Sequence, residues 1–125
     1  MPKFKITPRM RKDLITVTLD EVEYLLGYKV VTHDMKSLGL RKNPNIITFR
    51  QNQWITLPSD KVVPGKGDYG GIWLAISLGN ARRLQAYMGE KYEQETLIFE
   101  AITRDVLYYN SYRMKTSGIK LLDEI

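Results

Sequence analysis

The clearest alternation of hydrophobic and polar positions lies between Pro64 and Met88. A segment with four glycines is followed there by the uncharged run Gly-Ile-Trp-Leu-Ala-Ile at 71–76, which is typical of a strand covered on both faces. Ser77 is a suitable N-cap for a helix over 78–91. The apolar positions of this helix recur at spacings of three and four and form one stripe: Leu78, Ala81, Leu84, Met88 and Tyr92. The pattern predicts a glycine-rich loop, a central strand and a helix packed back on the sheet.

The segment before residue 28 carries two different signals. Leu14–Val17 is typical of a short edge strand. Thr18 and Glu21 then have the spacing of a capping box, in which each side chain satisfies a backbone N–H of the first helical turn. Gly27 is a suitable residue for ending such a helix. We therefore predict a short helix over 19–26.

The rest of the chain contains short runs that favour strands. In the first of them Tyr28, Val30 and Thr32 share one face, while Lys29, Val31 and His33 share the other. A turn and helical stub are expected at 34–40, a polar loop at 41–45 and a long loop at 58–71. Strands are expected at 28–33, 46–49, 54–57, 96–103, 106–109, 112–116 and 119–122. These elements indicate an α+β fold with two or three helices and mainly antiparallel strands.

Positive charge is concentrated at the N-terminus. The chain has 125 residues and a formal net charge of +5, and five of its 19 basic residues precede Asp13. The other 14 basic residues balance 14 acidic ones. We therefore divide the chain into a basic, poorly ordered arm over 1–13 and a single α+β domain over 14–125. Such an arm either binds nucleic acid or an acidic protein, or is a solvated terminus; its basic residues are Lys3, Lys5, Arg9, Arg11 and Lys12.

Composition argues against several classes of protein. The chain has no cysteine and one histidine, His33, which argues against disulfides, a thiolate nucleophile and a zinc site. No P-loop or serine–histidine–acid order is found, and we expect no metal. No stretch of about 18 apolar residues occurs and the first residues lack an apolar signal core, so we expect a cytoplasmic protein without a membrane span.

Two titratable residues are candidates for chemistry. His33 ends a strand and precedes Asp34, which could hold one imidazole tautomer; the alternative is a hydrogen-bonded packing residue. Glu100 shares a strand face with Ile98 and Ile102, so its carboxylate needs a partner or faces a cleft. The alternative for Glu100 is a salt bridge to Arg104, Arg113 or a lysine. The pair Arg82-Arg83 lies in the first turns of the predicted helix, where it either joins the helix N-terminus in binding an anion or remains solvated.

The order of these segments resembles the ADP-ribosyltransferase superfamily. The features that carry the resemblance are a strand ending in His33, the segment Ser37–Leu40, the run Gly71–Ala75, and a helix containing Ala81 and Tyr87. The tail 111–125 is similar to the end of the small bacterial rifamycin ADP-ribosyltransferases. The resemblance covers the chain loosely from residue 28 to residue 125.

The resemblance implies a split, mostly antiparallel sheet with NAD in the cleft between its parts. It implies that His33 bonds a ribose of NAD and that Trp73, in place of the family's tyrosine, stacks on nicotinamide. Gly71 and Tyr87 complete the cofactor-binding set. Glu100 is the nearest acid for the catalytic role, although no motif fixes that assignment. A carboxylate and an aromatic face would stabilise the positive charge that develops when the glycosidic bond breaks.

Two departures from the family pattern affect the functional prediction. Asp34-Met35 replaces a glycine and a small hydroxyl residue, and a carboxylate there would repel a pyrophosphate. Trp73 retains a stacking face but is bulkier than tyrosine. We therefore expect an ADP-ribosyltransferase-like domain that binds NAD with altered or lost transferase activity. The alternative is a non-enzymatic module that binds nucleic acid or an acidic protein through its basic arm.

Overall fold

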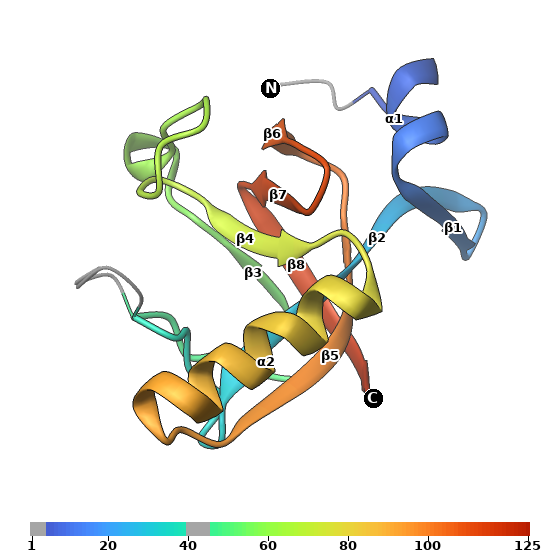
Figure 1. Ribbon diagram of the computed structural model, residues 1–125. Helices are drawn as coiled ribbons and strands as arrows, with labels where there is room; N and C mark the ends of the chain where they lie inside the picture. Colours follow the sequence, from blue (N-terminus) through green and yellow to red (C-terminus); the bar gives the residue numbers. More distant parts are fainter. Residues whose placement is uncertain (1–4, 40–45) are drawn as a thin grey trace.

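The fold is of the α+β class, with one mostly antiparallel sheet and a long helix, α2, against one of its faces (Figure 1). The structure, a computed structural model, describes residues 5–39 and 46–125. In chain order the elements are α1 (Pro8–Asp13), β1 (Ile15–Leu19), β2 (Val22–Thr32), β3 (Trp54–Thr56), the 3₁₀ turn η2 (Ser59–Lys61), β4 (Ile72–Ala75), α2 (Leu78–Tyr92), β5 (Thr96–Thr103), β6 (Val106–Tyr109), β7 (Arg113–Thr116) and β8 (Gly118–Glu124). Within the described ranges, no helix has the length and apolarity needed to cross a bilayer.

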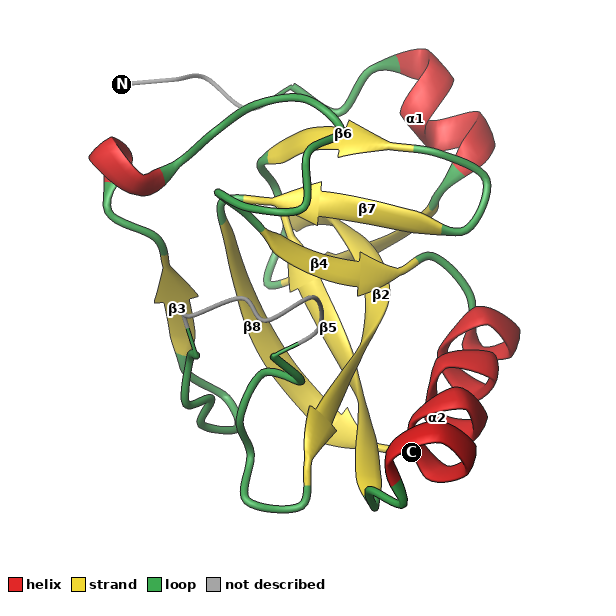
Figure 2. Ribbon diagram, turned by 60° about the vertical axis from the view of Figure 1, so that its left-hand side comes forward, coloured by secondary structure: helices red, strands yellow, loops and turns green. Residues whose placement is uncertain are grey.

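The sheet divides at β2 into two arms. Its strand order is β3-β8-β5-β2-β4-β7-β6, and β1 also pairs with β2. One edge of β2 pairs with β5 over residues 25–32. The other edge pairs first with β1 and then, through Tyr28 alone, with β4. Figure 2 shows the consequence: β4, β7 and β6 run across the direction of β2, β5 and β8. We call β2-β5-β8-β3 the first arm and β4-β7-β6 the second arm.

Gly27 makes the close approach of the two arms possible. A Cβ built on Gly27 would lie 2.7 Å from the Cε of Met114 on β7. It would also lie 3.0 Å from the carbonyl oxygen of Ala75 and from the Cβ of Leu74, both on β4. These distances are shorter than ordinary van der Waals contacts, so glycine lets the strands lie this close without any shift of Met114 or of β4.

Two hydrophobic clusters hold the sheet and the helix together. The larger cluster joins both arms and includes Leu25, Val31, Phe49, Ile72, Leu74, Phe99, Met114 and Leu121. The smaller cluster, built on Val30, Ala81 and Ile98, lies between α2 and the strands β2 and β5. β2 therefore contributes apolar side chains to both clusters, as expected for a strand with both faces covered.

The prediction for α2 is confirmed. The Oγ of Ser77 accepts a hydrogen bond from the backbone N–H of Asn80 at 3.2 Å, and the helix begins at Leu78. Its apolar stripe is buried at Ala81 and Met88, but the stripe ends there because Tyr92 is 51% exposed. The chain leaves the helix at Glu93, which has a left-handed backbone conformation.

The predicted helix over 19–26 is wrong, because this segment is a β-hairpin. Leu19 pairs with Val22, and the two intervening residues, Asp20 and Glu21, both have positive φ. Two such residues are the signature of a type I′ turn. The hairpin forms because β2 continues through Gly27 to Thr32 and pairs with β5 over its last eight residues. These long-range strand bonds outweigh the local capping-box signal.

The end of the predicted N-terminal arm is ordered. Residues 8–13 form α1, where Pro8 occupies the first turn and the Oγ1 of Thr7 accepts a hydrogen bond from Met10 N–H at 3.1 Å. Ile6 and Met10 pack against the larger hydrophobic cluster. The prediction that residues 1–13 are poorly ordered is therefore wrong for residues 8–13, which form a capped helix with an apolar side.

The other predicted elements agree in part. The edge strand at 14–17 and the strands at 28–33, 54–57, 96–103, 106–109, 112–116 and 119–122 are confirmed within one or two residues, apart from β2, which begins earlier. The strand predicted at 46–49 is wrong, because Thr48 makes only an isolated bridge to Lys36. Residues 34–39 form a turn and that bridge instead of a helical stub. Residue 40 and the polar loop predicted at 41–45 lie outside the described residues.

Candidate ligand-binding cleft

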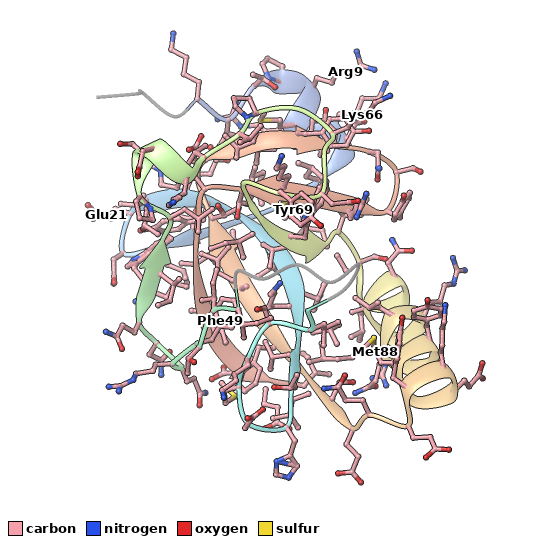
Figure 3. The ribbon with its side chains drawn as sticks, turned by 90° about the vertical axis from the view of Figure 1, so that its left-hand side faces the viewer. Arg9, Glu21, Phe49, Lys66, Tyr69 and Met88 are labelled. Carbon is pink, nitrogen blue, oxygen red and sulfur yellow. The ribbon has the colours of Figure 1, made fainter. Side chains whose placement is uncertain are left out.

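A cavity of about 810 Å³ opens where β4 separates from β2, next to α2. Its described walls come from the middle of β2, from β4, from one side of α2, from residues 37–39 and from the segment before β7. Figure 3 looks toward this side of the molecule, with Tyr69 beside β4 and Met88 on α2. The division of the sheet thus creates the cleft, because β2 and β4 pair only through Tyr28 and Ala75.

The described lining combines aromatic rings with positive charge. Within the described part of the chain, six aromatic side chains line the cleft: Tyr28, Phe49, Trp73, Tyr87, Tyr92 and Tyr112. The charged residues of the described lining are Lys29, Arg83 and Arg113 against one acid, Asp68. The described walls are therefore suited to a ligand with both a planar ring and an anionic group.

Trp73 on β4 is held in place from two sides. Its indole N–H donates a hydrogen bond to the carbonyl oxygen of Asp68 at 3.0 Å, which fixes the ring against the glycine-rich loop. The guanidinium carbon of Arg113 lies 3.9 Å from the ring centroid, and Tyr108 contacts the indole edge-on. A cation at this distance makes a favourable contact with the indole and covers part of its face.

Arg113 at the start of β7 links Trp73 to the glycine-rich loop. Its guanidinium lies 3.5 Å from a carboxylate oxygen of Asp68. Its Nε is buried and has no hydrogen-bond partner among the described residues. A buried donor without an acceptor is uncommon. Arg113 thus has one donor that none of the described groups satisfies, on a side chain that lines the cleft.

Lys29 enters the cleft from β2. Its Nζ donates a hydrogen bond to the carbonyl oxygen of Trp73 at 2.9 Å and lies 5.4 Å from the centroid of the Phe49 ring. No ion pair joins Lys29 to a carboxylate among the described residues. Burial lowers the pKa of Lys29 to about 8, because the charged ammonium is displaced from water.

Gly71 leaves room for a second lysine, Lys115, which is fully buried. Lys115 on β7 is 0% exposed, and its Nζ donates a hydrogen bond to the carbonyl oxygen of Gly65 at 3.1 Å. A Cβ at Gly71 would overlap the aliphatic stem of Lys115. Burial lowers the pKa of Lys115, while the charge of Asp68 partly opposes that effect. Lys115 therefore runs alongside Gly71 and fastens the glycine-rich loop to the sheet.

The structure brings together three of the five residues predicted for NAD and its chemistry. Gly71, Trp73 and Tyr87 all line the cleft. His33 lies in the exposed turn after β2 and is not part of the cleft lining. Glu100 lies on β5, half-buried opposite Tyr28, and also stays outside the lining.

The sequence did not identify Lys29 or Arg113 as residues of the cleft. Lys29 is a charged residue inside an otherwise apolar run, and that was the available signal. The sequence suggests Arg113 as a salt-bridge partner of Glu100, whereas in the structure Arg113 contacts Trp73 and Asp68. Arg83, named for anion binding near the start of α2, does line the cleft. Asp34 is hydrogen-bonded to Thr32 and does not line the cleft, so it is not placed to repel a ligand there.

The basic residues of the N-terminal arm lie elsewhere. Arg11 forms two hydrogen bonds with the carboxylate of Glu23, the shorter at 2.6 Å, and Arg9 lies 3.6 Å from Asp13. Lys5 and Lys12 are exposed. Lys3 lies outside the described residues. Part of the predicted nucleic-acid-binding charge is thus paired with acids of the same chain.

The comparisons with known proteins leave the function to be argued from the cleft. No family model, curated protein or solved structure matches the chain. The described residues contain no group of three or more histidine, aspartate or glutamate side chains arranged to bind a metal. The described lining supplies aromatic rings and cations, and Arg113 carries a buried donor that no described group satisfies.

Proposed function

We propose that the cleft between the two arms binds NAD, and that the protein is an ADP-ribosyltransferase-like domain whose transferase activity is altered or lost. The observation that carries this proposal is the convergence of Gly71, Trp73 and Tyr87 on one cavity of about 810 Å³. This volume is within the range of small-molecule sites, roughly 300–1,000 Å³. The loop, strand and helix of the segment 71–87 therefore contribute to a single site of suitable size.

The charge of the lining supports a phosphate-containing ligand. Lys29, Arg83 and Arg113 face Asp68 as the one acid of the described lining, and Asp68 is paired with Arg113. Arginine and lysine bind phosphate oxygens through charge-assisted hydrogen bonds. The aromatic side chains provide surfaces against which adenine or nicotinamide can stack.

The same lining argues against an unaltered transferase. Breaking the glycosidic bond of NAD develops positive charge, which a carboxylate near the ring would stabilise. Glu100 is not part of the cleft lining, and Asp68 is engaged with Arg113. Arg113 places a positive charge 3.9 Å from the Trp73 ring, where the predicted nicotinamide would stack. Binding of NAD with slow or absent transfer is therefore the function we propose.

Calorimetric titration with NAD tests the binding step. We expect saturable binding to the wild-type protein and at least a tenfold loss of affinity in Trp73→Leu. Trp54→Leu is the matched control, because Trp54 is 43% exposed on β3 and lies outside the cleft lining. Circular dichroism would confirm that both variants fold. Absence of binding at millimolar NAD, or equal losses in the two variants, would overturn the proposal.

Release of nicotinamide tests the altered chemistry. We expect little release when the wild-type protein is incubated with NAD, and the same rate in Glu100→Gln, because Glu100 does not line the cleft. Liquid chromatography of the products measures both rates. Rapid release that Glu100→Gln abolishes would instead identify an active enzyme with Glu100 as its acid.

A further inference from the structure

Lys29 is located where the two arms separate. It follows Tyr28, the residue through which β2 pairs with β4. Its side chain lies on the same face of β2 as those of Leu25 and Val31. Both of these neighbours are 0% exposed and belong to the larger hydrophobic cluster. A lysine on this apolar face thus extends across the gap between the arms and bonds to the carbonyl oxygen of Trp73.

The contacts that Lys29 makes with the described residues leave its charge largely unbalanced. A lysine ammonium has three donors, and the hydrogen bond to the Trp73 carbonyl uses one of them. The Phe49 ring provides a weak attraction at 5.4 Å. Holding an ammonium in an apolar setting without an opposite charge is unfavourable, and an anion in the adjoining cleft would relieve that cost.

We propose that Lys29 is the residue of β2 that binds the anionic part of the ligand. Its ammonium donates a hydrogen bond to a phosphate oxygen, while the Trp73 carbonyl holds the ammonium at the point where the two arms separate. This inference rests on the proposed binding of NAD and assigns the pyrophosphate a partner on β2. It also gives the cleft a selectivity: a nucleotide with phosphate binds well, and a nucleoside without phosphate binds poorly.

The titration of Lys29 provides a readout that a merely structural lysine would not give. Because its pKa is about 8 in the free protein, the charged fraction falls steeply between pH 7 and pH 9. Among the described residues, the other charged or titratable groups that line the cleft or lie beside Gly71 are Tyr28, Asp68, Arg83, Tyr87, Tyr92, Tyr112, Arg113 and Lys115. Of these, Lys115 also has a lowered pKa, so variants must separate the two lysines.

The experiment measures NAD affinity by calorimetry at pH 7 and pH 9 in four proteins. For the wild type we expect affinity to fall about tenfold over this interval, since the pyrophosphate itself does not titrate there. Lys29→Met should bind at least tenfold more weakly at pH 7 and show little change with pH. Lys29→Arg keeps the charge at both values and should bind with little pH dependence. Lys120→Met, on β8 outside the cleft lining, should behave as wild type.

The outcomes separate this inference from the proposed function. If the wild type binds NAD and Lys29→Met, shown to be folded by its thermal melt, binds equally well, the role of Lys29 is wrong while NAD binding stands. If the wild type does not bind NAD, inorganic pyrophosphate is titrated instead. Binding of pyrophosphate that Lys29→Met removes would support the anion site and overturn NAD as its ligand. Failure of both ligands would overturn both proposals.

Discussion

Two lysines, Lys29 and Lys115, carry their ammonium groups into the region where the arms meet. Lys115 is fully buried and fastens the glycine-rich loop, whereas Lys29 is half-buried and borders the cleft. Burial lowers the pKa of both residues. Each lysine therefore lowers the stability of the folded protein at neutral pH, unless a bound anion compensates for its charge.

The stability of the protein should report the pKa of Lys29 directly. The folded pKa is about 8 and the unfolded pKa is about 10.4, so between these values the unfolded chain binds more protons. The free energy of unfolding should then rise with pH across this window, and the gain should be lost as the pH falls through 8. Urea unfolding at pH 7, 8, 9 and 10 should show the wild type gaining roughly 1–3 kcal/mol relative to Lys29→Met. A constant difference between the two proteins would mean that Lys29 is not desolvated.

The residues of the site were predictable where their signals were local. Trp73 and Gly71 lie in the uncharged run at 71–76, and Tyr87 lies on the helix that follows, so all three belong to the strongest pattern in the chain. Lys29 could not be assigned in this way, because its role depends on where β4 leaves β2. That point is set by Gly27, Tyr28 and Ala75, which are brought together only by folding.

At the level of elements, local capping and long-range pairing lead to different results in two segments. Ser77 caps α2 in both the prediction and the structure, because the stripe that follows it packs on β2 and β5. Thr18 and Glu21 have an equally good capping pattern, yet the segment is a hairpin. A capping box contributes about 1 kcal/mol, which pairing along the length of β2 exceeds. Both segments carry a capping pattern, but the sequence alone does not show which segment pairs with other strands.

The substitution Glu21→Gly distinguishes the hairpin from the predicted helix by its sign. Glu21 has φ of 66°, a conformation that costs a non-glycine residue about 1 kcal/mol or more. Glycine should therefore stabilise the hairpin by about 1 kcal/mol, whereas in a helix it would cost about the same amount. Glu90→Gly in α2 is the matched control and should be destabilising. Urea unfolding measures both changes; loss of stability in Glu21→Gly would contradict the type I′ turn.

Gly27→Ala tests the close contact between the arms. The added methyl group would lie 2.7 Å from the Cε of Met114 and 3.0 Å from the backbone oxygen of Ala75, so the end of the Met114 side chain must turn away and β4 must shift by a few tenths of an ångström. We expect a loss of roughly 1–3 kcal/mol in the free energy of unfolding. Gly89→Ala, where nothing lies within 4 Å of the added atom, should instead stabilise α2 by about 1 kcal/mol. Equal effects of the two substitutions would show that the arms are not tightly packed at Gly27.

On the scale of the whole molecule, two regions of positive charge lie on separate parts of the fold. The cleft is formed by α2 and by the strands where the two arms of the sheet separate. In contrast, α1 packs through Met10 on the larger hydrophobic cluster. The general class, an α+β fold with antiparallel strands, was predictable from the succession of short runs. The position of the basic arm was not predictable from the sequence, because α1 is anchored by contacts to residues far along the chain. One of these is the hydrogen bond that the Tyr109 hydroxyl donates to the carboxylate of Asp13.

Substitutions in these two regions should change the effect of NAD on thermal stability differently. A ligand present at 100 times its dissociation constant adds about 2.7 kcal/mol to the stability of the folded state. For a chain of this length that gain should raise the Tm by about 10 °C. The double variant Lys5→Gln/Lys12→Gln should show the same rise, because neither residue lines the cleft and both are exposed. Lys29→Met, which is expected to bind at least tenfold more weakly, should show about half of this rise or less at the same NAD concentration. If the arm variant instead lost the rise in Tm, the nucleotide would be bound by the arm, and the salt-sensitive nucleic-acid interaction expected for Lys5 and Lys12 would become the better account of the protein.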